Sequence, residues 1–213
     1  IKNIKQLRGH LEISNVGKLS KYHSAEAQLK NKEYLDKLTL LWGDQSLGDR
    51  NDIEVLPDLQ PPASIKSLVL EDYRGVSLPT WFQPESLPGL TSVSFVSCHG
   101  LETIPTVDIN NGSIGFSSLT DLIINGCPCL SSLEQLLDPT YLPVIKRIAI
   151  MKCLNLISLP TERLGEFSSL EIFKVVECGK INSQSLVAPS LKKLVLGNKE
   201  ASSNNDCGNL TDN

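Results

Sequence analysis

Four cysteines are the first candidates for chemistry in this sequence of 213 residues. Cys98, Cys127, Cys153 and Cys178 each end a short apolar segment, as in "LTSVSFVSC" and "LEIFKVVEC". Thiols could form disulfides, bind a metal ion or act as nucleophiles. Each of these functions requires a particular geometry, which the elements around the cysteines would have to supply.

The spacing argues against all three functions. If the segments pair in a parallel sheet, equivalent residues lie roughly 4.8 Å apart with parallel Cα–Cβ bonds, whereas a disulfide needs Cβ atoms about 3.8 Å apart. Four stacked thiols form a line about 14 Å long, not the tetrahedron that zinc requires. Of the three histidines, only His99 adjoins a cysteine. We therefore predict four buried structural thiols with S–H groups directed at loop carbonyls, no metal site and no catalytic residues.

The cysteine segments are copies of one pattern. Each starts with an aliphatic residue, has apolar residues three and five positions later, and has its cysteine eight positions later. Three further segments match without a cysteine, and one fits in part: "LDKLTLLWG", "IKSLVLEDY", "LKKLVLGNK" and "HLEISNV". The starts recur every 21 to 30 residues or so, roughly the period of a leucine-rich repeat, and the LxxLxLxx core matches that repeat.

The predicted fold class is α/β, a curved leucine-rich repeat solenoid of about eight repeats. A parallel sheet lines its concave face, and irregular or short helical segments form its convex face. Residues 1–200 form this domain, as a piece of a longer protein, and residues 201–213 are predicted to be disordered. A longer helix is expected from "SAEAQLKNKEYL", with Ser24 as its N-cap. Residues 43–52 and 107–115 are polar and are predicted to be mobile loops.

Composition narrows the function classes. The net charge is −4 and the pI about 5.4, with no basic cluster of the kind that nucleic acid binding requires. No apolar run reaches the roughly 20 residues of a membrane span. Free buried cysteines favour a reducing compartment, so we expect a cytoplasmic protein.

Residues that alternate with the buried aliphatics face the concave surface, where solenoids commonly bind partners. The early repeats place acidic residues there and the last three place basic ones. We hypothesise a bipolar surface whose basic end binds an acidic protein patch, although these charges could equally be solvated only. Trp42 could instead be covered by the loop after it or by a preceding domain. The candidate partner-binding residues are Trp42, Glu71, Asp72, Asp121, Arg147, Met151, Lys152, Ile172, Lys174, Val176, Glu177 and Lys193.

The repeat LxxLxLxxCxxLxxLP resembles the leucine-rich repeat region of plant intracellular nucleotide-binding leucine-rich repeat resistance proteins. "LRGHLEISNV", "AEAQLKNKEYLDKLTLLW" and "LPGLTSVSFVSC" are similar to stretches of their coiled-coil class. The resemblance implies a non-enzymatic domain that senses a pathogen or pest effector, directly or through a host protein, in the cytoplasm and also the nucleus. It further implies a role in autoinhibition, with the receptor's own nucleotide-binding domain as a partner in cis.

Nucleotide binding is not expected in this chain. The phosphate-binding pattern GxxxxGK[ST] does not occur in it, so ADP or ATP is expected only in a nucleotide-binding domain outside these residues. The alternative function is the substrate-recognition domain of an F-box ubiquitin ligase, which an F-box upstream would reveal. An extracellular leucine-rich repeat receptor is disfavoured because its LxGxIP turn and paired capping cysteines are absent.

Overall fold

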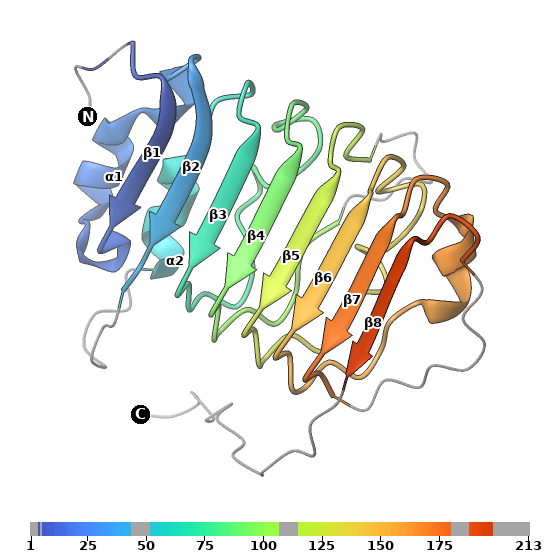
Figure 1. The fold of residues 1–213 in the computed structure, drawn as a ribbon. Coiled ribbons are helices and arrows are strands. Elements are labelled where there is room, and N and C mark those ends of the chain that lie inside the picture. Colours follow the sequence, from blue (N-terminus) through green and yellow to red (C-terminus); the bar gives the residue numbers. More distant parts are fainter. Residues whose placement is uncertain (1–3, 5, 44–51, 107–114, 180–187, 198–213) are drawn as a thin grey trace, which may run out of the picture.

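An eight-stranded parallel sheet forms one side of the molecule in the computed structural model (Figure 1). The structure describes residue 4 and residues 6–43, 52–106, 115–179 and 188–197. Each strand pairs with the next one along the chain, in the order β1 to β8. This topology confirms the predicted leucine-rich repeat solenoid. The strands are β1 Gly9–Ser14, β2 Leu35–Leu41, β3 Ser67–Glu71, β4 Ser92–Val96, β5 Asp121–Asn125, β6 Arg147–Met151, β7 Ile172–Val176 and β8 Lys193–Gly197.

The LxL centre of the repeat builds the core. Alternate residues of a strand point to opposite faces, and in β4 Val93 and Phe95 are buried while their neighbours are half-buried. The register aligns Leu68, Val93, Leu122, Ile148 and Phe173 across five strands. Each buried side chain therefore packs between its equivalents in the neighbouring repeats, which makes one continuous core.

The core is less covered at its C-terminal end. Leu194 and Leu196 of β8 pair in register with Phe173 and Val175 of β7. The two β7 residues are 1% and 5% exposed, whereas the two leucines are 43% and 50% exposed. Within the described part of the chain, β8 ends the sheet.

Short helices and irregular segments lie behind the sheet, on its convex side (Figure 1). None of the helices in the described ranges is both long enough and apolar enough to cross a bilayer. The helices are the 3₁₀ helices η1 Val16–Lys18, η2 Leu29–Asn31, η3 Leu56–Leu59 and η5 Thr161–Glu166, and the α-helices α1 Lys21–Ala27 and α2 Asp52–Val55.

The helix predicted from residues 24–35 is present only in part: α1 begins earlier than expected, at Lys21, and ends at Ala27, so residues 28–35 lie outside it. Its N-cap is Ser20, whose side chain accepts a hydrogen bond from the backbone N–H of His23 at 3.3 Å. Ser24 lies inside α1, fully buried, with its hydroxyl 3.1 Å from Asp58 Oδ2. Gln28, at φ 47°, ends the helix in a left-handed conformation. Most of both predicted mobile loops, and all of residues 201–213, fall outside the described residues.

Aromatic side chains fill the space between the sheet and the convex side. Phe82 packs against Phe95 and Phe116 with ring centroids 5.7 and 5.6 Å apart. Trp81 is buried and its indole N–H donates to the Leu56 carbonyl at 3.2 Å. Trp81 and Phe82 therefore both pack inside the solenoid.

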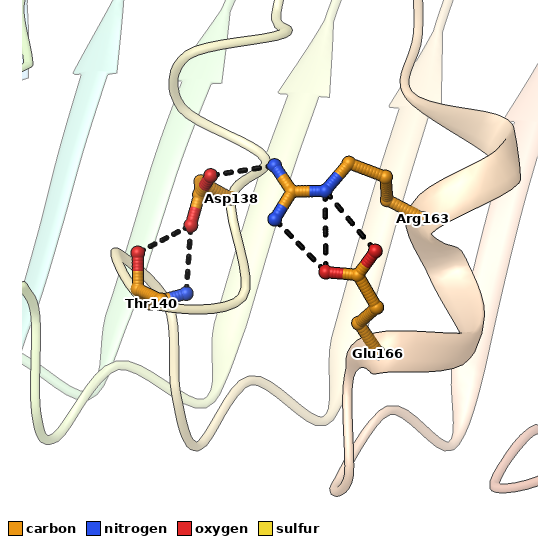
Figure 2. Close-up of polar contacts among 4 residues, drawn as sticks. All are labelled: Asp138, Thr140, Arg163 and Glu166. Atoms are coloured by element: carbon orange, nitrogen blue, oxygen red, sulfur yellow. Dashed lines mark hydrogen bonds and ion pairs between the residues drawn. The ribbon is translucent and has the colours of Figure 1, made fainter.

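A polar cluster ties two neighbouring repeats together on the convex side (Figure 2). Arg163, on η5, donates to Asp138 Oδ2 at 2.6 Å and to Glu166 Oε2 at 2.9 Å. The other Asp138 oxygen accepts from the Thr140 backbone N–H at 2.8 Å and from its hydroxyl. Partial burial acts to raise the pKa of Asp138, but Thr140 and Arg163 stabilise the carboxylate and bring the net pKa below its ordinary value.

Replacing Asp138 should therefore weaken the fold in a pH-dependent way. We expect Asp138→Asn to lower the free energy of unfolding at pH 7 by about 1 kcal/mol, because hydrogen bonds to a carboxylate are lost. A lowered folded-state pKa stabilises the protein above the unfolded-state pKa, and this stabilisation disappears as the pH falls through the folded-state pKa. Urea unfolding at pH 7 and pH 3 measures both effects.

Glu166→Gln is the matched control. Glu166 contacts Arg163 within one helical turn and its side chain is 54% exposed, so the loss should stay within about 0.5 kcal/mol. Equal losses in the two variants would contradict a special role for Asp138.

The turn after β4 brings two backbone segments too close for any side chain. A Cβ atom added to Gly100 would lie 1.8 Å from the carbonyl oxygen of Arg74, in the preceding repeat. Backbone cannot rotate away as a side chain can, so the two repeats would have to separate at this point.

We expect Gly100→Ala to destabilise the chain by about 3 kcal/mol, which is the cost of overpacking against backbone. A Cβ on Gly197 in β8 would lie 3.8 Å from Val176 Cγ1, an ordinary contact, so Gly197→Ala should change stability by less than about 0.5 kcal/mol. Urea unfolding midpoints of both variants test the difference. If Gly100→Ala were as stable as Gly197→Ala, the close approach would not constrain the repeat stack.

Candidate recognition surface

Several strands end at a residue in the left-handed conformation. Asp72, Ser97, Lys152 and Glu177 have φ between 52° and 59°, and Gly126 has φ 70° at the same position. The N–H of each donates to the last carbonyl of the next strand, for example from Ser97 to Asn125 at 2.7 Å. The turn ends the alternation, and the residue after it, which is a cysteine in four repeats, lies in the core.

The four thiols are buried and lie under the ends of their strands. Cys98, Cys127 and Cys153 are 0% exposed and Cys178 is 8% exposed, and all four are free thiols. Cys98 Sγ lies 3.5 Å from the carbonyl oxygens of both Leu70 and Val96. The acceptors are therefore strand carbonyls, and the expectation of loop carbonyls is wrong. The left-handed turn causes this, because it folds each cysteine back beneath its own strand.

The stacked thiols also influence one another's acidity. The pKa of Cys153 rises to about 12 because of the neighbouring Cys127 thiol and burial, against an opposing effect of Cys178. Cys153 lowers the pKa of Cys127, but the Cys98 thiol and burial outweigh it and raise that pKa to about 12 as well. The Cys153 thiol and burial raise the pKa of Cys178. These groups stay protonated at neutral pH and are poor nucleophiles.

Alkylation tests this assignment. In a Cys129→Ala, Cys207→Ala background, we expect the remaining thiols to resist iodoacetamide at pH 8 under conditions that fully modify the urea-unfolded chain, as read by mass spectrometry. A raised thiol pKa stabilises the fold below the unfolded-state value near 9, and this stabilisation is lost as the pH rises toward about 12. Rapid labelling of native Cys127 or Cys153 would contradict the buried assignment.

The register arranges the side chains of the concave face in three columns that cross the strands. Asp121, Arg147, Ile172 and Lys193 belong to the first column. Glu71, Met151 and Val176 belong to the third column, and Asp72, Lys152 and Glu177 follow their strands at its edge. The middle column, which contains Lys174, consists of Thr39, Val69, Ser94, Ile123, Ala149, Lys174 and Val195.

Eleven of the twelve candidate residues thus lie on or beside this face, and Trp42 does not. Trp42 is 1% exposed and packs on Tyr73 with ring centroids 4.9 Å apart. In this repeat the positive φ belongs to Gly43, one position later, so the alternation that buries Leu38 and Leu40 continues to Trp42. The prediction that Trp42 contacts a partner is therefore wrong.

The charges on this face are also less segregated than predicted. Asp121 and Arg147 are register partners on β5 and β6 and form an ion pair at 3.4 Å. Glu171 similarly pairs with Lys192 at 2.9 Å. Lys152, Lys174 and Lys193 make no ion pair with any described residue. The unpaired positive charge therefore gathers on β6 to β8.

Comparison with known proteins agrees with the repeat and its likeness to resistance proteins. Residues 1–127 match the family of R13L1/DRL21 leucine-rich repeats. At3g14460 of Arabidopsis thaliana, named for disease resistance, is 33% identical in an alignment of 119 residues that covers 50% of this chain and 8% of that protein. RGA1 of Solanum bulbocastanum, also named for disease resistance, is 26% identical in an alignment of 198 residues that covers 83% of this chain and 19% of that protein.

The disease resistance protein RGA2 of Solanum bulbocastanum is 26% identical over 131 residues, covering 60% of this chain and 12% of that protein. The chain thus spans less than a fifth of the length of each of these three relatives. The family match covers the first repeats, with β1 to β5, and the RGA1 alignment covers 83% of this chain. This chain belongs to the R13L1/DRL21 leucine-rich repeat family, and its repeats are similar to those of plant disease resistance proteins.

Proposed function

We propose that this chain is the non-enzymatic recognition domain of a plant immune receptor and that its concave face binds protein. Its target is a pathogen or pest effector, or a host protein that an effector modifies. The family supports a role in disease resistance. The observation that carries the proposal is the concave face itself, where half-buried apolar residues surround lysines that have no ion-pair partner among the described residues.

The proposal assigns a second role to the N-terminal end of the solenoid, namely contact with the receptor's own nucleotide-binding domain. Tyr22 and Tyr34 are 68% and 51% exposed there, and the Arg8 guanidinium lies 4.5 Å from the centroid of the Tyr34 ring. Aromatic side chains and arginine are enriched at protein interfaces. Such a contact in cis supports autoinhibition of a receptor in the cytoplasm and nucleus, with ADP or ATP held by the nucleotide-binding domain and not by this chain.

Charge reversal in the full-length receptor tests the recognition role. We expect Lys152→Glu, Lys174→Glu and Lys193→Glu together to abolish coprecipitation of the effector or host target and the cell-death response that it triggers. Like charges introduced at a contact repel, and each can cost several kcal/mol. Coprecipitation and response are measured with a panel of candidate effectors expressed beside the receptor in leaves.

The matched control reverses two exposed lysines outside the three columns of the concave face and away from the N-terminal end: Lys66 and Lys146. This variant should accumulate, bind and respond like the wild-type receptor. An unchanged response in the concave variant would contradict the proposal, as would an equal loss in the control.

A further inference from the structure

Lys174 has an unusual position on the concave face. It is the central residue of β7, with Ile172 and Val176 two positions away on the same face of the same strand. Ala149 of β6 and Val195 of β8 are its register partners on either side. All four neighbours are apolar. The ammonium group therefore rises from an apolar surface, and the lysine itself is partly buried.

The carboxylates closest to Lys174 in the register are already engaged. Asp121, two strands away, pairs with Arg147, and Glu171 pairs with Lys192. Glu177 comes after the end of β7, at the edge of the face. Within the part of the chain that the structure describes, Lys174 makes no ion pair. Its charge is thus available to a partner.

An ammonium in an apolar ring favours one kind of ligand. A partner whose own apolar groups cover Ile172, Val176 and Val195 would exclude water from the ammonium, and a charge pair is much stronger in such a setting than in water. A phosphate group carries more charge and requires several converging donors, typically arginines, whereas a lone lysine among aliphatic residues matches one carboxylate.

We propose that Lys174 anchors the side-chain carboxylate of one Asp or Glu in the partner protein, flanked on both sides by apolar side chains. The flanking residues contact Ile172 and Val176, with Met151 of β6 as an adaptable neighbour on the same face. This inference rests on the proposed function and specifies the chemistry of its target. Lys152 and Lys193, which are more exposed, attract the partner but do not select the residue.

Selection from a random 12-residue peptide library displayed on phage tests the inference. Against the wild-type chain, we expect enriched peptides to share one Asp or Glu between apolar residues. Against Lys174→Glu, Lys or Arg should replace the acidic residue at that position. A selected peptide should lose affinity for Lys174→Met by about tenfold or more, and its Glu→Gln version should lose a similar factor against the wild-type chain.

Lys37→Glu is the matched control, because Lys37 is an exposed lysine of β2 on the same face of the sheet and distant in register from β7. The Lys37→Glu variant should enrich the same peptides as the wild-type chain, with one Asp or Glu between apolar residues. Circular dichroism melting curves that match the wild type establish that the Lys174 variants are folded.

Two results would overturn the inference: selection that enriches no acidic residue against the wild-type chain, or a pattern that survives Lys174→Glu unchanged. Enrichment of peptides whose C-terminal carboxylate is required would also overturn the assignment to a side chain. The receptor assay separates this inference from the proposed function. A receptor that responds normally with its concave lysines reversed refutes the function, whereas a failed peptide selection refutes only the role of Lys174.

Discussion

The packing of each buried aliphatic residue between its equivalents in the neighbouring repeats is the constraint on which this molecule depends. A single repeat has two inward residues per strand and cannot bury them alone, so every repeat derives its core from the repeats beside it. Parallel pairing in one register aligns these residues, and the same register aligns the outward residues into columns. The proposed recognition surface therefore depends on core packing, because any change that shifted one strand by a residue would exchange its buried and exposed side chains.

The cysteines show how a chemically reactive residue type becomes a structural one. A left-handed turn ends the strand and places the thiol beneath it, where two backbone carbonyls lie within reach of Cys98 Sγ. A small, weakly polar side chain suits this place, because a larger residue needs extra room there. Tyr73 occupies the equivalent position in an earlier repeat, with its hydroxyl donating to the Ser77 carbonyl at 2.9 Å. Repeats can therefore vary in this position when the following turn adapts.

Periodicity in the sequence predicted the strands and the sheet, because the apolar positions of the LxxLxLxx pattern are the residues that pack in the core. The Asp121–Arg147 pair could also have been predicted, since both residues hold the same outward position in successive copies. The burial of the Trp42 side chain could not be predicted from this periodicity. The face to which Trp42 points depends on which residue at the end of the strand adopts the left-handed conformation, and the repeat pattern does not specify that residue. The Asp138–Arg163 ion pair could not be predicted either. Both residues lie in return segments of irregular length, where no sequence period aligns one repeat with the next.

The half-exposed leucines of β8 imply that local stability is lower at this end of the described sheet than at its centre. A central strand such as β5 is hydrogen-bonded on both sides, but β8 has one neighbour in the described sheet and contributes little buried area to it. Local opening of β8 consequently costs less free energy than global unfolding, and its amide hydrogens should exchange before those of β5. Lys174 lies on β7, next to β8, so the proposed partner site is adjacent to the least covered strand of the described sheet. A partner that contacts both Lys174 and Val195 of β8 would therefore favour the ordered form of β8.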